Sequence, residues 1–213
     1  MDDSMRSNET KHGRLPNIQY DALSTAQKAA HDAIASGPRG KVEGPLAIWI
    51  MNLVLAEKLQ QLGSYCRFGS SLPPRLSELA IIIVGAFWKA DFEWCAHAPI
   101  AEKAGISLTV IEAIRLQRAP KFVRDDEAAL YYFLRSLLEE HQVPDAIYQN
   151  LIREVGQTAA IDLVGIAGYY GSVCMTLNAF CVPLPDDLVS PFSGTPQPTS
   201  GVTLQHPSVF PAS

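Results

Sequence analysis

A 20-residue segment without a single charge constrains the fold of this chain more than any other feature. Residues 163–182, LVGIAGYYGSVCMTLNAFCV, are long enough to cross a bilayer as a helix. No basic residue flanks the segment, and Asp186 and Asp187 follow it. Its glycines recur three residues apart, a spacing that lets helices approach each other closely. The pattern therefore favours a helix buried at the centre of a helical protein or oligomer, and we expect no membrane contact.

The rest of the chain also has helical rather than strand periodicity. Runs of apolar residues at helical intervals, bounded by capping residues, glycines or prolines, predict further helices. No segment alternates polar and apolar residues between turn signals, so we expect an all-α protein. The predicted helices cover residues 24–37, 46–69, 74–88, 91–106, 107–117, 124–142, 144–156 and 159–182.

Composition divides the chain into one domain with two extensions. Residues 1–19 are polar and aperiodic, which predicts a loose N-terminal arm. Residues 20–187 contain all the predicted helices and form the domain. Residues 188–213 are rich in proline, serine, glycine and threonine, which predicts an extended tail.

Charge and cysteine content exclude several classes of function. The 213 residues carry a net charge of −5, and lysine and arginine are scattered singly, so we expect no nucleic-acid partner. The four cysteines form no C-x-x-C pair and no zinc-binding pattern with histidine, so we expect no metal. The N-terminus lacks the apolar stretch of a signal peptide, and we expect reduced thiols in the cytoplasm.

The stretch DFEWCAHAP, residues 91–99, concentrates polar groups that could perform chemistry. Glu93 and His97 lie four residues apart and so share a helix face, whereas Cys95 points away and Asp91 is expected to cap the helix. A carboxylate one turn from an imidazole can orient the ring and raise its basicity, as a general acid–base histidine requires. The alternative is an ordinary exposed ion pair.

Glu78 is the second acidic candidate, because it stands at the head of a helix that is almost entirely apolar. It is either exposed at the helix start or buried and in need of a partner. If the helices that carry Glu78 and His97 form a hairpin, the two side chains can meet near its open end.

Residues 72–107, LPPRLSELAIIIVGAFWKADFEWCAHAPIAEKAGIS, resemble the carboxymuconolactone decarboxylase family, which includes the alkylhydroperoxidase D-like proteins. The shared features are R-x-x-E-L-A-I, E-W-x-x-H and A-x-x-A-G-[IL]-S in that order, and the resemblance reaches roughly from residue 40 to 187. It implies an all-α helical bundle that assembles as a homo-oligomer, a trimer, hexamer or dimer.

The peroxidase branch of this family has a C-x-x-C pair before the histidine, and here Ala90 and Glu93 occupy those two positions. Cys95 lies at neither position, so we do not expect it to act as a redox thiol. The resemblance instead implies a cofactor-independent lyase, of the type used in aromatic degradation, that decarboxylates a small carboxylated lactone.

In that interpretation His97 donates the proton, Glu93 orients it and Glu78 relays or tunes its charge. Arg75 either holds a substrate carboxylate or pairs with Glu78. Trp94 and Tyr169 are candidates for the pocket wall. The alternatives are a thiol-dependent peroxidase and a non-catalytic helical oligomer of the same fold.

Overall fold

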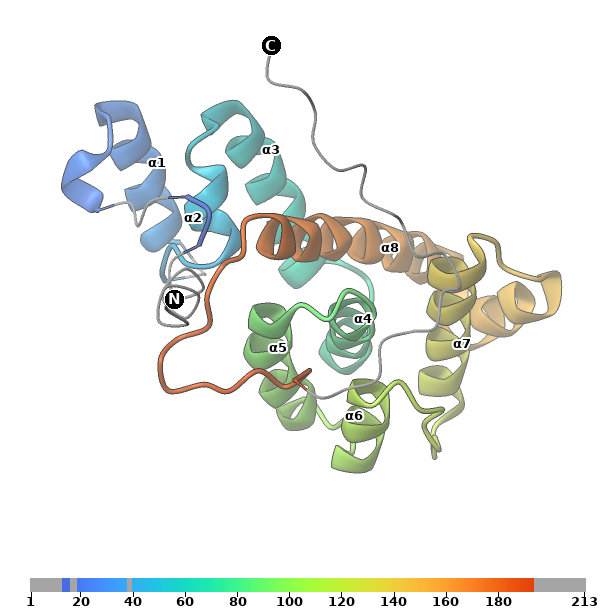
Figure 1. Ribbon diagram of the computed structural model, residues 1–213. Coiled ribbons are helices and arrows are strands. Elements are labelled where there is room, and N and C mark those ends of the chain that lie inside the picture. The colour runs from blue at the N-terminus through green and yellow to red at the C-terminus, as the bar shows by residue number, and fades with distance from the viewer. Residues whose placement is uncertain (1–12, 16–18, 38–39, 194–213) are drawn as a thin grey trace, which may run out of the picture.

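The computed structural model describes residues 13–15, 19–37 and 40–193. Within these residues it contains helices and turns and no strand, which confirms the all-α prediction (Figure 1). The α-helices are α1 (Thr25–Ala35), α2 (Pro45–Trp49), α3 (Leu53–Ser64), α4 (Pro74–Phe87), α5 (Asp91–Lys103), α6 (Leu108–Arg115), α7 (Asp125–Glu140) and α8 (Asp145–Ala179). A 3-10 turn, η1 (Tyr20–Ala22), precedes α1, and a π-helical turn, η2 (Tyr65–Gly69), follows α3.

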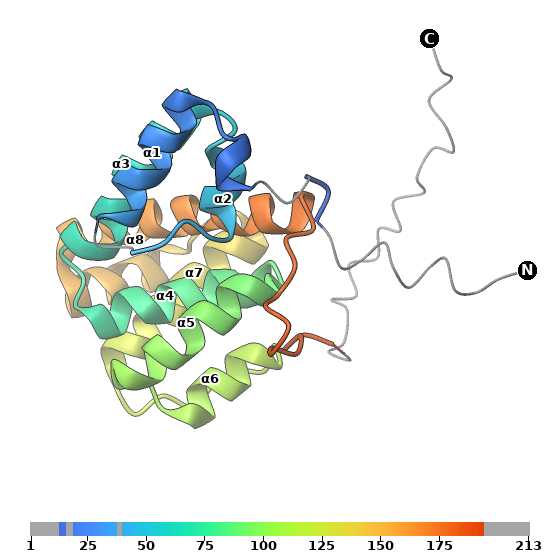
Figure 2. The ribbon, with the colours of Figure 1, turned by 90° about the vertical axis from the view of Figure 1, so that its left-hand side faces the viewer.

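Helix α4 forms the centre of the molecule. From Leu79 to Ala86 every side chain is buried, because this helix packs against α5, α7, α8 and α6 on its different sides. Figures 1 and 2 show α4 enclosed by these helices, with α8 lying across it. An all-apolar helix surrounded in this way gains about 1.5–3 kcal/mol from each large side chain that it buries. That burial fixes the position of any polar residue on α4, including Glu78.

Helix α8 is the long apolar helix that the uncharged segment predicted. It is bent at Gly156, whose φ of +82° is non-helical and divides it where the sequence separated residues 144–156 from 159–182. Among the described residues, α8 is also the one helix with the length and composition to cross a membrane. More than half of its most apolar window, 56%, is buried inside the fold. Core packing therefore accounts for its apolar character, and the absence of membrane contact stays a prediction.

The segment 46–69 is not one helix, and that prediction was wrong. The chain leaves the helical conformation after α2 and re-enters it at Asn52, whose side chain accepts a hydrogen bond from the Leu55 amide and caps α3. After Ser64 the helix widens into η2. A π-turn contains an extra residue, so the side chains that follow it point in other directions than they would in a continuous α-helix. Hydrophobic periodicity alone does not reveal this change of direction.

The predicted cap of α5 is also wrong. The helix begins at Asp91 itself, Ala90 occupies the N-cap position, and the Asp91 side chain makes no capping hydrogen bond. Its Oδ1 atom is buried without a hydrogen-bond partner among the described residues. Asp91 still contributes a negative charge to the first turn, where the helix dipole favours it.

Both extensions contact the domain more closely than the sequence predicted. In the N-terminal arm, the Arg14 amide and guanidinium donate hydrogen bonds to the carbonyls of Phe180 and Ala179 at the end of α8; residues 1–12 and 16–18 lie outside the described residues. At the other end, Phe192 is buried against the Trp94 ring, and Arg115 donates a hydrogen bond to the Pro191 carbonyl. The domain therefore continues beyond residue 187.

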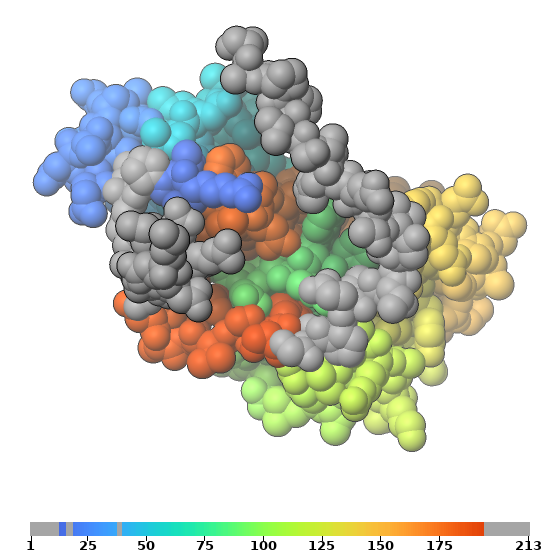
Figure 3. Space-filling view, in the orientation of Figure 1, coloured from blue at the N-terminus to red at the C-terminus, as the bar shows by residue number. Residues whose placement is uncertain are grey.

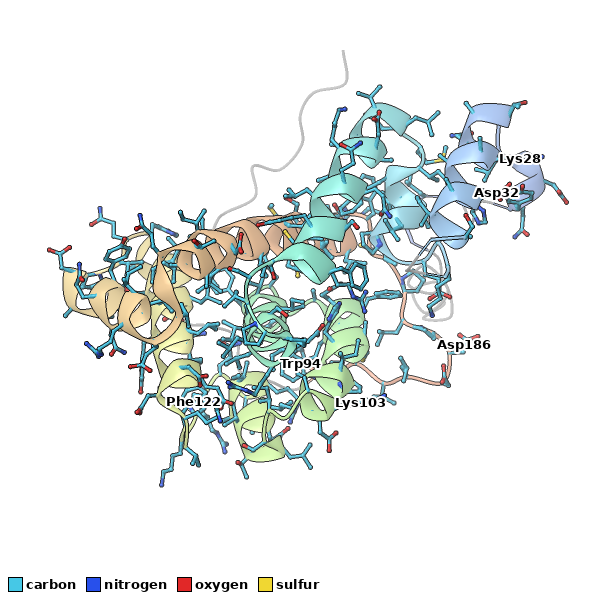
Figure 4. The ribbon with its side chains drawn as sticks, turned by 180° about the vertical axis from the view of Figure 1, so that it is seen from behind. Lys28, Asp32, Trp94, Lys103, Phe122 and Asp186 are labelled. Atoms are coloured by element: carbon cyan, nitrogen blue, oxygen red, sulfur yellow. The ribbon has the colours of Figure 1, made fainter. Side chains whose placement is uncertain are left out.

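We refer to residues 183–192 as the C-terminal strap. It leaves the end of α8 and runs across to α5 and α6, and the space-filling view shows it covering this face of the helices (Figures 1 and 3). Trp94 lies in the interior, whereas Asp186, on the strap, projects away from the helices (Figure 4). The rest of the tail, residues 194–213, lies outside the described residues.

Gly44, at the start of α2, provides a test of this packing. Its φ is +58°, and a Cβ atom added there would lie 2.6 Å from a ring carbon of Phe92. We expect Gly44→Ala to lower the free energy of unfolding by about 2–4 kcal/mol, through backbone strain and overpacking together. Chemical denaturation measures this change.

Gly40→Ala is the matched control, because Gly40 also has a positive φ, +73°, but no atom of the described residues lies within 4 Å of an added Cβ. It should cost about 1 kcal/mol from backbone strain alone. Equal losses in the two variants would contradict the close contact between Gly44 and Phe92.

Candidate active site

His97 lies between two carboxylates in the interior of the protein. Its Nδ1 atom is 2.6 Å from Glu78 Oε2 on α4, and its Nε2 atom is 3.1 Å from Glu93 Oε1 on α5. The three residues are only 5–6% exposed. The structure thus brings together all three residues that the sequence singled out for acid–base chemistry.

The α4–α5 hairpin creates this arrangement. The connection at residues 88–90 is tight, because Lys89 adopts a φ of +49° and the Ala90 amide donates back to the Gly85 carbonyl. The two helices then pack side by side. Glu93 and His97 are one turn apart on α5, and Glu78 meets them from α4, as the hairpin hypothesis required.

The two carboxylates control the protonation of His97. Burial alone lowers the pKa of this imidazole, but the negative charge of Glu93 and the hydrogen bonds to Glu78 and Glu93 outweigh it and raise the pKa from 6.5 to about 9. His97 is therefore an imidazolium at neutral pH. A proton is held in a nearly dry environment, between two groups that can accept it.

A cavity of about 250 Å³ opens beside this triad. That volume lies near the small end of the range for ligand pockets, so it suits a small molecule. Its wall is formed by side chains from α2 and the loop before it, the π-turn, α5, α8 and the strap. They are Lys41, Glu43, Pro45, Leu46, Arg67, Phe92, Glu93, Cys95, Ala96, His97, Tyr169, Tyr170, Val173, Leu184, Pro185 and Leu188.

The two glutamates differ in their position relative to the cavity. Glu93 and His97 line it, whereas Glu78 does not and lies on the other side of the imidazole. Glu78 is thus placed to hold the ring and its charge, and Glu93 contacts Nε2 at the cavity wall. The sequence assigned orientation to Glu93 and relay to Glu78; the geometry favours the opposite division.

Tyr170 adds a hydroxyl to the same wall. Its ring packs edge-on against His97, with 5.4 Å between the ring centroids. Burial, followed by the negative charge of Glu93, raises the pKa of Tyr170 well above its usual 10, so the hydroxyl stays protonated. It makes no hydrogen bond within the described part of the chain and is available as a donor. Tyr169, which the sequence proposed for the pocket wall, also lines the cavity.

Two predicted substrate contacts lie elsewhere. Arg75 faces α7, where its guanidinium contacts the carboxylates of Asp126 and Glu127 at 2.5 Å each, so it neither lines the cavity nor pairs with Glu78. Trp94 does not line the cavity and packs against Phe192. Both assignments were wrong because the partners come from distant segments of the chain.

Sequence reasoning missed Arg67, the arginine that does line the cavity. A weak signal was present, because no acidic residue lies three or four positions from Arg67 on either side, so it has no local partner. The π-turn that sets its direction was not visible in the apolar pattern.

All four cysteines are free thiols. Cys95 lines the cavity, but burial and the charge of Asp91 raise its pKa, so it is held as a thiol rather than as a reactive thiolate. Cys66 and Cys174 are buried, whereas Cys181 is exposed. Within residues 13–15, 19–37 and 40–193, no group of three or more His, Cys, Asp or Glu side chains is arranged to hold a metal ion.

Comparison with known proteins supports the fold. No family model and no curated protein matches the chain. Among solved structures, an alkylhydroperoxidase AhpD core from Ralstonia eutropha, an uncharacterized peroxidase-related protein, aligns with a TM-score of 0.64 at 17% identity, over 84% of this chain and 94% of that one.

Two further structures agree. An uncharacterized peroxidase-related protein from Silicibacter sp. gives a TM-score of 0.65 at 14% identity, over 82% of this chain and 92% of that one. A protein of unknown function from Agrobacterium tumefaciens gives 0.58 at 12% identity, over 67% and 99%. At such identities the likeness shows the fold alone: this chain has the all-α, alkylhydroperoxidase AhpD-like fold that its sequence predicted.

The raised pKa of His97 predicts how stability depends on pH. Because the folded protein binds this proton more tightly than the unfolded chain, the stabilisation is complete below pH 6.5 and is lost as the pH rises through about 9. At about 1.4 kcal/mol per pKa unit, the loss is at most about 3 kcal/mol. Urea denaturation of the wild type between pH 6 and pH 9.5 measures it.

His97→Gln should remove this part of the pH dependence, whereas His141→Asn should retain it. His141 is exposed at the end of α7 with a φ of +62°, a conformation that asparagine tolerates. A wild-type stability that stays constant across this pH range would contradict the tight binding of the proton.

The contact between Phe192 and Trp94 predicts how the strap is held. Phe192→Ala removes the buried ring, so the strap should detach and be cleaved by protease several times faster, with a smaller effect on the rest of the fold. Val189→Ala, at a strap residue that is 82% exposed, is the control and should leave cleavage unchanged. Equal cleavage rates in the two variants would show that Phe192 does not anchor the strap.

Proposed function

We propose that this chain is a cofactor-independent enzyme that uses acid–base chemistry on a small organic acid, and that its reaction is the decarboxylation of an unsaturated lactone acid. The observation that carries this proposal is the buried His97 imidazolium, held by Glu78 and Glu93 at the wall of a small cavity. A fixed proton donor beside a largely apolar pocket is what protonation of carbon requires.

The reaction needs no external electron acceptor. When carbon dioxide leaves, the C–C bond to the carboxylate breaks, and its electron pair moves through the conjugated double bond onto the lactone carbonyl oxygen. The resulting dienolate takes a proton at carbon, and the carbonyl forms again. The enzyme supplies the proton and stabilises the negative oxygen, and water later restores the proton to the enzyme.

The geometry supports a division of labour among the residues. The proton passes from His97 Nε2 to Glu93, which faces the cavity, and from there to the substrate carbon. Glu78 holds the imidazole through Nδ1 and acts as a positioning residue. Tyr170, with its protonated and unpartnered hydroxyl, is suited to donate a hydrogen bond to the dienolate oxygen.

A thiol-dependent peroxidase is the second candidate, because Cys95 lines the same cavity and two of the solved structures with this fold are described as peroxidase-related. Its raised pKa and the lack of a disulfide partner count against it. A non-catalytic oligomer of this fold is the third candidate, and it gives no reason to bury an imidazolium between two carboxylates.

We also propose that the chain forms a homo-oligomer in the cytoplasm. Tyr65 and Phe68 in η2, and Ile161 and Val164 on α8, are large apolar side chains that are roughly half exposed or more. The hydrogen bond from Tyr65 to Asp162 places the two sets next to each other. A contiguous apolar surface of this kind is typical of a protein contact.

Carbon dioxide release from 4-carboxymuconolactone tests the reaction. We expect turnover in the wild type, and a loss of about 10²–10⁴-fold in kcat for His97→Gln and for Glu93→Gln. Glu78→Gln should cost about 10–100-fold, as residues that support a catalytic group do. It should also move the alkaline limb of the pH–rate profile to lower pH, because it removes a hydrogen bond that raises the pKa of His97.

Glu102→Gln is the matched control, since this exposed glutamate lies on α5 away from the cavity. It should leave turnover unchanged. Wild-type activity in His97→Gln, or no turnover in the wild type, would refute the proposed reaction. Peroxide reduction that disappears in Cys95→Ser would favour the peroxidase instead.

A further inference from the structure

We infer that Arg67 is the residue that anchors the substrate carboxylate that does not react. This inference rests on the proposed function, because it assigns a binding residue to the same cavity. It replaces Arg75, whose guanidinium is occupied by Asp126 and Glu127.

The π-turn η2 places Arg67 at the cavity. This turn follows α3 directly, and π-turns within helices are frequently found at functional sites. It is fixed from two sides, because Tyr65 donates a hydrogen bond to Asp162, and Asp162 also accepts two hydrogen bonds from Ser71 just beyond the turn. Between these fixed points Arg67 joins Glu93, His97 and Tyr170 in the cavity wall.

Arg67 also lacks the partner that comparable arginines in this protein have. Arg75, Arg115 and Arg135 are each partly buried, and each pairs with a carboxylate. Arg67 is likewise half-buried, yet no carboxylate of the described residues lies within ion-pair distance of it. Its guanidinium lies over the Phe68 ring, 5.5 Å from the centroid, which leaves its hydrogen-bond donors unused.

An acidic substrate can bind in this cavity only if a free cation lies in its wall. The imidazolium of His97 between two carboxylates leaves a net charge of about −1, which repels an anion. Lys41, the other cation in the wall, is paired with Glu43 at 2.5 Å and is largely exposed. Arg67 is therefore the cation of the described wall residues that is free to receive a carboxylate.

The carboxylate at Arg67 cannot be the one that leaves. Decarboxylation moves negative charge out of the departing group, so an arginine paired with that group would stabilise the ground state more than the transition state and would slow the reaction. A second carboxylate keeps its charge throughout and can remain anchored. The other walls, including Leu46, Phe92 and Val173, are apolar and suit the unsaturated ring between the two acid groups.

The test compares binding of 2-furoate, a small unsaturated ring acid, with that of its neutral amide, 2-furamide, by titration calorimetry. We expect the wild type to bind 2-furoate at least tenfold more tightly than 2-furamide. Arg67→Gln should lose this preference, and Arg67→Lys should retain part of it because the charge remains. Arg118→Gln, which removes an exposed arginine outside the cavity, is the matched control and should bind like the wild type.

A preference for 2-furoate that persists in Arg67→Gln would overturn the inference, as would a wild type that binds the two compounds equally or binds neither. Thermal unfolding of each variant confirms that the fold is intact. Because 2-furoate does not react, this result is independent of turnover. A preference that depends on Arg67 in a protein without decarboxylase activity would reject the proposed reaction alone, and turnover without that preference would reject the carboxylate anchor alone.

Discussion

The contact between His97 and its two carboxylates is the constraint to which the rest of the structure is adapted. Three ionisable side chains are removed from water here, and the desolvation of each costs several kcal/mol unless partners compensate. To compensate for desolvation, His97 must contact Glu78 on α4 at 2.6 Å and Glu93 on α5 at 3.1 Å at the same time. The fold must therefore hold α4 and α5 in one fixed relation.

The apolar character of α4 provides that fixed relation. Side chains from Leu79 to Ala86 pack against four other helices, so the helix can neither slide nor rotate without exposing apolar surface. Glu78, one position before this run, is held by the same packing. The tight turn at Lys89 then sets the position of α5. The packing of α4 that stabilises the fold thus also holds the charged residues of the candidate site in place.

The sequence predicted the part of the site that depends on local geometry. Glu93 and His97 are neighbours because four residues make one helical turn, and Glu78 joins them because short connections produce antiparallel helices. Long-range contacts were not predictable in the same way. Arg75 was misassigned because its partners, Asp126 and Glu127, lie some 50 residues further along the chain.

The same limit explains Trp94 and Arg67. Trp94 was a candidate for the pocket wall, but its side chain leaves on another face of α5 and meets Phe192, about 100 residues away. Arg67 was missed because its direction depends on a π-turn that no hydrophobic pattern encodes. Residue spacing thus predicts which groups share a helix, whereas the walls of a cavity between helices follow from tertiary packing.

The thiol and the imidazolium of this cavity show why the fold alone does not determine the reaction. A peroxidase needs a thiolate and a second thiol that can form a disulfide with it. Here burial, followed by the charge of Asp91, raises the pKa of Cys95 and keeps it protonated, and the other thiols are unpaired. The same helices carry Glu93 at a position where the resemblance places a redox cysteine, and Glu93 contacts His97. In the proposed function, the carboxylate at that position exchanges a proton with His97, whereas a cysteine there would take part in a redox reaction.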